Sequence, residues 1–289
     1  MSQLTSQAGT RVDQRGPFHW SLIVAVNDQR VFESNLLTSP DLDGGCQIVP
    51  KHGFPSASKA YNAGIFEAVH DVLVFAHQDV YLPHGWLNSL RVALARLVAV
   101  DPHWGVVGVY GIARAGGAAG YVYSTGIGAF LGKPFVELLE AESLDEMLLV
   151  TRRSAQLLFD ENLPGFHLYG ADICLEAKKR SMRSYVLPAF CIHNSNGIRF
   201  LPTPFWRSYL YIRRKWWDEL PVRSCCTVIT KSPFPVFKYF LTRGRDFLIS
   251  SVSVGRRCSD PGLLYQHLVM ANGTAEQGGQ KPSSLHGHP

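Results

Sequence analysis

The sequence lacks any apolar run close to the roughly 20 residues that a membrane-spanning helix needs. Its longest apolar candidate, VALARLVAV, is short and contains Arg96. The N-terminal stretch MSQLTSQAGTRVDQRG has no apolar core of the kind found in signal peptides. The six cysteines form no CxxC pair and do not have the spacing of a zinc framework, which favours a reducing compartment. We therefore expect a cytoplasmic protein, and these features leave open a peripheral contact with the inner face of a membrane.

Several nucleotide-binding and catalytic motifs are also missing. The Gly-rich stretch ARAGGAAG (113–120) lacks the lysine of a P-loop and does not fit GxGxxG. No Ser-His-Asp or Cys-His arrangement is apparent, so nothing indicates a nucleophile on the protein. The Gly-rich stretch is interpreted either as a flexible loop over a site or as a structural loop.

What the chain does have is a globular composition, with 46% hydrophobic and 18% charged residues over 289 positions. That length is enough for a sizeable core. The net charge of +5 fits two interpretations. The charge reflects either a solvated surface with surplus arginine or a preference for phosphate-bearing ligands or anionic membranes.

Short apolar runs predict an α/β fold. WSLIVAV (20–26), CQIV (46–49) and DVLVFAH (71–77) are typical of buried strands. Helical spacing of small and apolar residues follows Pro55, with Ser56 near the expected N-cap. Strand and helix alternate over the first 110 residues, which predicts a mostly parallel central sheet flanked by helices.

Changes in composition suggest four segments along the chain. Residues 1–17 are expected to be a disordered lead, and residues 18–199 to form the α/β domain. Residues 200–270 mix aromatic residues with arginines and are expected to form a helical extension, and 271–289 a disordered tail. The rings of that extension either dock on the α/β domain, which we favour, or lie in a membrane interface. Nucleic-acid binding is disfavoured because no binding motif accompanies the basic residues.

Chemically useful side chains follow the ends of predicted buried elements. Asp79 ends the run VLVFAHQD, Asp172 lies near a helix start, and His193 follows the strand SYVLPAFCI. Ligands of open α/β sheets bind just past the carboxyl ends of such strands. Asp and His can hold Mg²⁺ or Mn²⁺, and a separate carboxylate can act as a general base. Taken singly, His193 and Asp172 are more typical of core and capping residues; their joint placement favours a site.

The order of five segments resembles a known family. These are SLIVAVND, GFPSASKAYNAGIFEA, HQDV, LDEMLLVTRRS and FHLYGADICLEAKKRSMRSYVLPAFCIHNS. Together they are similar to the inverting family 2 glycosyltransferases of GT-A fold, in the branch with HQDVYLP at the position of the DxD motif. The resemblance runs from about Trp20 to Ser195, with a weaker match through RRKWWDELPV.

The resemblance implies a role for each matching residue. Asp79 and His193 would bind Mg²⁺ or Mn²⁺, and Asp172 would deprotonate the acceptor hydroxyl. Five residues would lie near the nucleotide sugar: Asn27, Ser58, Asn62, His77 and Gln78. Asp145 and Glu146 would lie on the acceptor side. His77 departs from the family by replacing the first Asp of DxD, and GADIC has one acid where the family often has two.

The implied function is metal-dependent transfer of a sugar from a UDP- or GDP-sugar to a hydroxyl of a glycan or lipid-linked saccharide. One alternative is a nucleotidyltransferase, although VNDQRVFES after the first strand has no glycine. Another is a non-catalytic GT-A domain that binds a glycan or a partner, which the two departures keep open.

Overall fold

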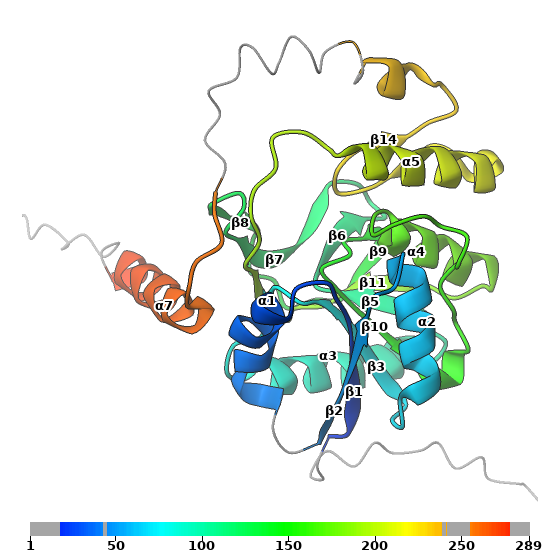
Figure 1. The fold of residues 1–289 in the computed structure, drawn as a ribbon. Helices are drawn as coiled ribbons and strands as arrows, with labels where there is room; N and C mark the ends of the chain where they lie inside the picture. The colour runs from blue at the N-terminus through cyan, green and yellow to red at the C-terminus, as the bar shows by residue number, and fades with distance from the viewer. Residues whose placement is uncertain (1–17, 43–44, 239–240, 242–254, 278–289) are drawn as a thin grey trace, which may run out of the picture.

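A computed structural model of the chain describes residues 18–42, 45–238, 241 and 255–277 (Figure 1). The expected lead, 1–17, and residues 278–289 of the expected tail lie outside this range. The strands are β1 (Trp20–Val26), β2 (Cys46–His52), β3 (Val72–His77), β4 (Val80–Tyr81), β5 (Val106–Gly108), β6 (Tyr110–Ala113), β7 (Ala118–Ser124), β8 (Ala129–Gly132), β9 (Leu139–Leu144), β10 (Leu148–Arg152), β11 (Ser184–Val186), β12 (Cys191–His193), β13 (Val222–Arg223) and β14 (Val228–Ile229). The helices are α1 (Gln29–Ser34), α2 (Ala57–Glu67), α3 (Trp86–Val100), α4 (Tyr169–Lys179), α5 (Thr203–Lys215) and α7 (Pro261–Gln277).

The α/β class is confirmed, with one large sheet in the order β2-β1-β3-β10-β5-β11-β9-β6-β7-β12-β4 and β8 beside β7. Parallel pairing joins β2, β1 and β3, and also β5 with β11 and β7 with β12. The other pairs of this sheet are antiparallel, so the expectation of a mostly parallel sheet holds only for its first three strands. The later strands β6, β7 and β8 follow one another through tight turns, which join antiparallel neighbours.

The two faces of the sheet carry separate apolar clusters, because successive residues of a strand point to opposite sides. Leu22, Val24 and Val74 pack on the side of α1 and α3. Ile23 and Phe75 pack on the side of α2, α4 and α5. Burial on both sides explains why the sequence of β1 and β3 is continuously apolar.

Helix α2 approaches β1 closely at a glycine. A Cβ on Gly64 would lie 2.2 Å from Cγ2 of Ile23, so a larger residue would push the helix away from the sheet. The expected N-cap is present, since the Ser56 hydroxyl accepts the N–H of Lys59 at 3.4 Å. The cap marks the start of α2, and Gly64 sets how closely its later turns pack on β1.

The aromatic-basic segment after residue 200 docks on the α2 side of the core. Helix α5 and its C-cap bury an apolar set on their inner face: Phe205, Trp206, Tyr209, Ile212 and Trp216. Trp217 is exposed, with the Arg213 guanidinium 4.9 Å from its ring centre. Most of the rings therefore stabilise the fold, and several cations remain outside.

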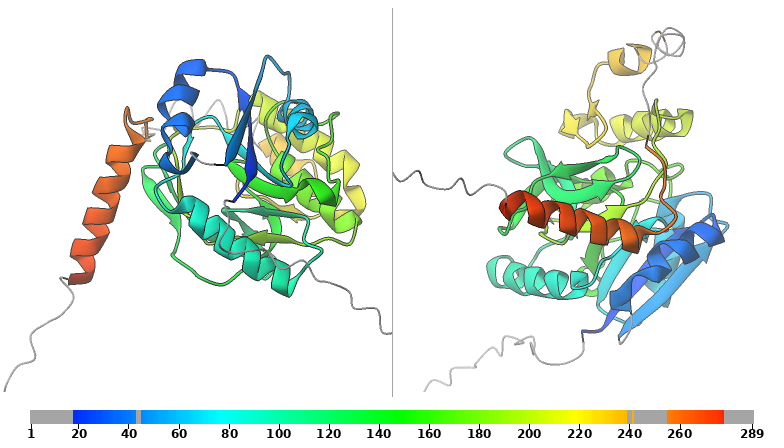
Figure 2. Two further views of the ribbon diagram at one scale, coloured as in Figure 1. Left: turned by 90° about the horizontal axis from the view of Figure 1, so that it is seen from below. Right: turned by 90° about the vertical axis from the view of Figure 1, so that its left-hand side faces the viewer.

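Helix α7 projects from the body of the molecule (Figure 2). It extends to Gln277 and so passes residue 271, where a disordered tail was expected to begin. Its N-terminal end packs on the body of the molecule through Pro261, which is buried, and through Tyr265, whose ring centre lies 6.1 Å from that of Phe190. Among the described residues, no helix has the length and apolar character that crossing a membrane requires.

Candidate functional site

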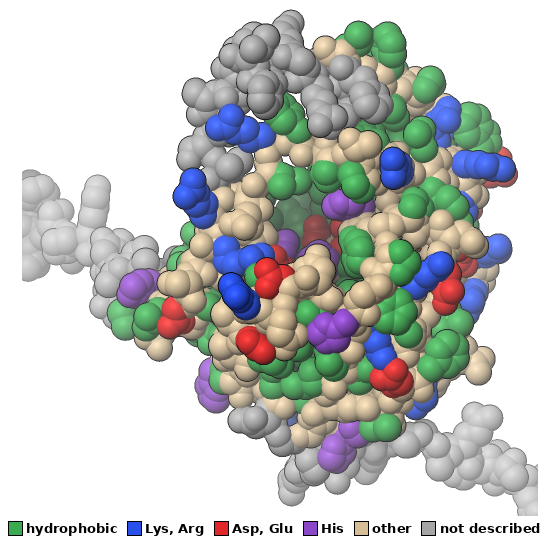
Figure 3. All heavy atoms as spheres, in the orientation of Figure 1, with side chains coloured by type: hydrophobic (Ala, Val, Ile, Leu, Met, Phe, Trp, Pro, Cys, Tyr) green, Lys and Arg blue, Asp and Glu red, His purple; other side chains and the backbone are tan. Residues whose placement is uncertain are grey.

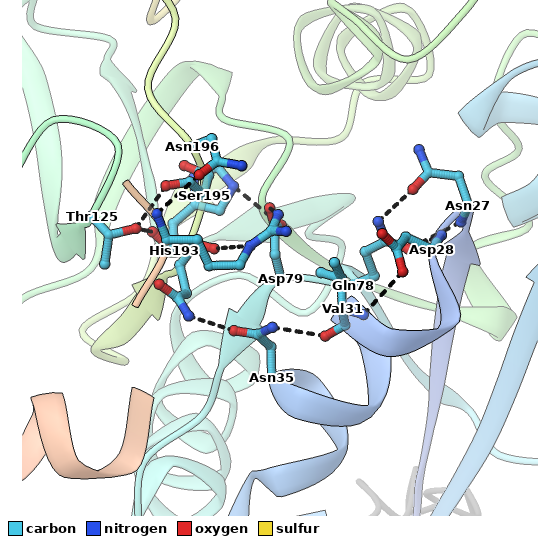
Figure 4. A network of polar contacts seen from close by, with 12 residues as sticks. Asn27, Asp28, Val31, Asn35, Gln78, Asp79, Thr125, His193, Ser195 and Asn196 are labelled. Carbon is cyan, nitrogen blue, oxygen red and sulfur yellow. Dashed lines mark hydrogen bonds and ion pairs between the residues drawn. The ribbon is translucent and has the colours of Figure 1, made fainter. Parts of the chain in front are cut away.

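Polar residues after β1 and β3 are tied together at the carboxyl edge of the sheet (Figure 4). The side-chain oxygen of Gln78 accepts the N–H groups of Asn27 at 3.0 Å and Asp28 at 3.1 Å. The Gln78 amide also donates to the side-chain oxygen of Asn27. Asp28 caps α1 by accepting the N–H of Arg30 at 3.0 Å. Gln78 thus fixes the two strand ends relative to each other.

His77, Asp79 and His193 form a cluster beside this link. Strand β12 pairs with β4 so that His193 lies opposite Val80, which brings it next to Asp79. One potential ligand atom from each of the three residues lies within 4.8 Å of the others. His193 Nε2 is 3.4 Å from Asp79 Oδ1, and the two imidazole rings are 5.5 Å apart. All three side chains are half-buried.

The cluster shifts the proton affinity of its own members. Burial would raise the pKa of Asp79, but the hydrogen bond and charge of His193, together with Arg257, hold it below its usual range. Burial would lower the pKa of His193, and the bond to Asp79 outweighs this and raises it. Burial and the charge of His193 lower the pKa of His77 to about 4. His77 is therefore neutral at pH 7.

Tyr169 fixes the tautomer of His77. Its hydroxyl donates to the main-chain oxygen of Glu146 at 3.0 Å and lies 2.8 Å from His77 Nε2. Because the single hydroxyl hydrogen is used, the hydroxyl accepts a hydrogen from Nε2 of His77. The lone pair of His77 then sits on Nδ1, as expected for a metal ligand held by a neighbouring polar group.

These residues fit a divalent cation. Two imidazoles and a carboxylate offer nitrogen and oxygen ligands, a set suited to borderline metals such as Mn²⁺. Mg²⁺ prefers oxygen ligands and suits this set less well. A bound cation would replace the proton of His193, because metal ligands must be deprotonated.

Asp145 and Glu146 lie in the turn between β9 and β10, next to the end of β3. The N–H of His77 donates to the main-chain oxygen of Met147 at 2.9 Å, which anchors this turn. The Glu146 carboxylate accepts backbone N–H groups of Leu168 and Gly170 at the start of α4. Burial and the neighbouring charge of Asp145 raise the pKa of Glu146 to about 8.

Two further features shape this turn. A Cβ on Gly170 would lie 2.3 Å from the main-chain oxygen of Leu144, so only glycine lets α4 begin this close to β9. The thiol of Cys225, in the turn between β13 and β14, hydrogen bonds to Asp145, and burial raises its pKa. The hairpin of the C-terminal extension therefore borders the two acids.

Asp172 does not join this group. It is 1% exposed, and its carboxylate accepts hydrogen bonds from Lys215 at 2.8 and 3.0 Å and from the Trp216 indole at 2.7 Å. The expected role as proton acceptor for a substrate does not fit this placement, because the side chain faces α5. The helical register of α4 decides this orientation, and the motif alone did not reveal it.

Lys215 connects three carboxylates between α4 and α5. Its ammonium nitrogen lies 2.8 Å from carboxylate oxygens of Asp160, Asp172 and Glu176.

Lys215→Met should lower the free energy of unfolding by about 3 kcal/mol, because acidic groups would remain together without their cation. Urea unfolding measures this change. The exposed neighbour Arg214 is the control, and Arg214→Met should change stability by less than about 0.5 kcal/mol. Equal midpoints for the two variants would show that Lys215 does not hold α5.

Ser58 and Asn62 are buried on α2 and, in the described part of the chain, form no hydrogen bond with the polar residues that follow β1 and β3. Asn62 donates to the main-chain oxygen of Phe159 at 2.8 Å and accepts its N–H at 2.9 Å. The Ser58 hydroxyl has no hydrogen-bond partner among the described residues. Asn62 therefore ties α2 to the loop before α4, and neither residue lines the cavity at the ends of β1 and β2.

That cavity, of about 420 Å³, lies beside Asn27. Its lining residues come from the ends of β1 and β2, the first residue of α1 and the loop before α4: Ala25, Val26, Asn27, Gln29, Lys51, His52, Gly53, Phe54 and Phe166. In Figure 3 this face of the molecule also shows a hollow with acidic and histidine side chains in it, whereas the cavity beside Asn27 has no acidic lining residue. The strand-end rule applied to β2 would have identified His52 and Phe54. No sequence signal singled out Phe166.

A larger cavity, of about 590 Å³, lies between β9, α4 and β13. Its acidic side chains are paired with basic ones, Glu142 with Arg223 and Glu219 with Lys178. None of the polar strand-end residues lines it. We therefore place the chemistry at the ends of β1 and β3 rather than in this larger cavity.

The sequence matches one protein family over much of its length. The model of a glycosyltransferase-like family matches residues 21–202. A Fuscovulum blasticum protein named "ATP synthase subunits region ORF 6" is 32% identical over 131 residues, which are 44% of this chain and 52% of that protein. The chain thus spans about half the length of that relative.

Solved structures show a partial likeness. GalNAc-T7 with UDP, GalNAc and Mn²⁺ has a TM-score of 0.48 and 11% identity, covering 71% of this chain and 49% of the other. The mannosyltransferase PcManGT from Pyrobaculum calidifontis, with GDP-Man and Mn²⁺, has a TM-score of 0.42 and 12% identity, covering 90% and 82%. TarS 1–349 of S. aureus with UDP-GlcNAc has a TM-score of 0.43 and 14% identity, covering 71% and 67%.

Proposed function

The chain belongs to the glycosyltransferase-like family, and we propose that it transfers a sugar from a nucleoside-diphosphate donor to a hydroxyl acceptor with inversion at the anomeric carbon. One observation carries this proposal. The cluster of His77, Asp79 and His193 lies at the same sheet edge as an open cavity at the ends of β1 and β2. Gln78 and Asn27 connect the two.

The nucleotide spans these two places. The base lies in the cavity of about 420 Å³, where Phe54 and Phe166 offer aromatic surface. Asn27 lines the cavity and is hydrogen bonded to Gln78, the neighbour of Asp79, so its side chain would contact the ribose between base and diphosphate. The diphosphate then reaches His77, Asp79 and His193. Ser58 and Asn62 act indirectly by holding α2, because both are buried.

His77, Asp79 and His193 would hold Mn²⁺ or Mg²⁺, which as a Lewis acid neutralises the charge that develops on the leaving diphosphate. Other residues of the protein orient the three side chains that would bind the metal. Tyr169 keeps the lone pair of His77 on Nδ1. The hydrogen bond between Gln78 and the end of β1 keeps Asp79 at the sheet edge.

Glu146 takes the proton of the acceptor hydroxyl. Two backbone N–H groups at the start of α4 fix its carboxylate, and burial together with the neighbouring charge of Asp145 raises its pKa to about 8. A buried carboxylate with a raised pKa is a common arrangement for acid–base work. With Glu146 as the base, the acceptor oxygen displaces the diphosphate directly, and a single displacement of this kind inverts the anomeric carbon.

A saccharide, free or linked to lipid, is the acceptor. Phe234, Phe237 and Leu241 are exposed large apolar side chains near the lysines Lys231 and Lys238, which supports a peripheral contact on the cytoplasmic face of a membrane. Co-sedimentation with anionic vesicles measures this contact. A protein that stays in the supernatant at low salt would point to a free saccharide.

A nucleotide titration tests the function. The full chain is titrated with UDP and with GDP in Mn²⁺, in Mg²⁺ and in EDTA, and binding is followed by calorimetry. One of the two nucleotides should bind with metal, more tightly with Mn²⁺ than with Mg²⁺, since two of the three ligands are imidazoles. Turnover of the matching sugar nucleotides then identifies the sugar. Failure to bind either diphosphate in any metal would contradict the proposal.

A further inference from the structure

Residues 255–258, which precede α7, lie against the strand-end site. The N–H of Gly255 donates to Gly126 O at 3.1 Å, and the N–H of Gly197 donates to Gly255 O at 2.9 Å. The fully buried Asn194 accepts the N–H of Cys258 at 2.8 Å and donates to Cys258 O at 2.9 Å. These contacts fix the backbone of the segment on both sides of Arg257.

Arg257 extends from this segment to Asp79. Its Nη2 donates to Asp79 Oδ2 at 3.0 Å, and its Nε donates to the main-chain oxygen of Asn194 at 2.8 Å. Its backbone N–H donates to the side chain of Asn196 at 3.1 Å. The side chain is 26% exposed. Within the described part of the chain, Nη1 makes no hydrogen bond.

The two oxygens of Asp79 are divided between two partners. Oδ1 faces His193 Nε2 at 3.4 Å, where a cation would bind, and Oδ2 faces Arg257. Arg257 therefore does not occupy the oxygen that points into the cluster. It adds a fixed positive charge at the rim of the cluster, next to the place of the leaving diphosphate.

We propose that Arg257 binds the diphosphate of the donor through Nη1 while Nη2 stays on Asp79. This inference rests on the proposed function and names a further residue of its donor site. A guanidinium presents several donors in one plane, so it can bridge a carboxylate and a phosphate at once. The site also needs this charge, because Asp145 lies close enough to His77 and His193 to act on both through its charge, and a diphosphate brings further negative charge.

A purely structural role makes a different prediction. If Arg257 only held the segment 255–258 in place, its loss would weaken every ligand of the site to a similar degree. If it binds the diphosphate, its loss would weaken nucleoside diphosphates and leave the monophosphate of the same nucleoside unchanged. Comparison of UDP with UMP, or of GDP with GMP, therefore separates the two roles.

The experiment measures Kd values of the full chain by calorimetry in Mn²⁺ and again in EDTA. Arg257→Gln should weaken diphosphate binding roughly 10- to 100-fold, the usual effect of losing a charged hydrogen bond. Arg257→Lys should recover part of the affinity, because it keeps the charge and loses the fork. Arg256→Gln is the matched control, since Arg256 is the exposed neighbour, and it should bind as the wild type does. Binding of the monophosphate also reports that each variant is folded.

The outcomes are distinguishable from failure of the proposed function. If the wild type binds neither UDP nor GDP with metal, the proposed function fails and the inference falls with it. If the wild type binds and Arg257→Gln binds the diphosphate equally well, only the inference is overturned. Equal weakening of diphosphate and monophosphate in Arg257→Gln likewise overturns it and assigns Arg257 to holding the segment.

Discussion

Asp79→Asn is expected to abolish metal-dependent nucleotide binding while leaving the fold intact. Asp79 supplies the single negative ligand of the cluster, between His193 and Arg257. Loss of a residue that only orients a ligand costs roughly 10- to 100-fold in metal affinity, so loss of the ligand itself should cost more than about 100-fold. Calorimetry with Mn²⁺ and UDP or GDP measures the effect, and thermal unfolding checks the fold.

The matched control is Asp41→Asn. Asp41 accepts the N–H of Leu87, at the start of α3, at 3.0 Å. Its other charged partner is His84, so its contacts do not include the cluster residues. This variant should bind metal and nucleotide as the wild type does. Retention of Mn²⁺-dependent binding by Asp79→Asn would remove Asp79 from the donor site and end the assignment of the cluster.

Glu146→Gln is expected to lose sugar transfer by roughly 10²- to 10⁴-fold, the usual range for a general base. Donor and Mn²⁺ binding should remain, because Glu146 is not among the cluster residues. The wild-type kcat/KM should rise with pH, reach half of its plateau near pH 8 and level off above it, since the pKa of Glu146 is about 8 and only the deprotonated form accepts a proton. The residual activity of the variant should lack this rise.

Asp172→Asn serves as the comparison for the base. Asp172 contacts Lys215 and Trp216 within the core, so its replacement should lower stability and change transfer by less than about tenfold. A large loss of transfer in Asp172→Asn, with normal donor binding and an unaffected Glu146→Gln, would reverse the two roles.

The sheet edge could be predicted because its signal is local. The apolar runs of β1 and β3 and the polar residues that follow them are read directly from the sequence, and parallel neighbours end at one edge. His193 could be joined to Asp79 because its own short strand also ends at that edge. The resemblance to a family added the order of these pieces and their chemistry.

Other features depend on tertiary packing that the sequence does not display. Asp172 lies in the expected helix, yet the rotation of α4 points it at Lys215 instead of the site. Arg257 follows Asp79 by a long stretch of chain and belongs to no motif, so only the contact of residues 255–258 with Asn194 reveals it. The mixed sheet beyond β3 likewise follows from tight turns between β6, β7 and β8.

A crystal structure with Mn²⁺ and the bound nucleoside diphosphate tests the central claim most directly, because Mn²⁺ can be located by its anomalous scattering. We expect one strong peak about 2.0–2.3 Å from a ligand atom of each of His77, Asp79 and His193. The diphosphate should contact this ion, and the base should lie between Phe54 and Phe166. A nucleotide in the cavity lined by Glu142 and Lys178, or no peak between Asp79 and His193, would contradict the account.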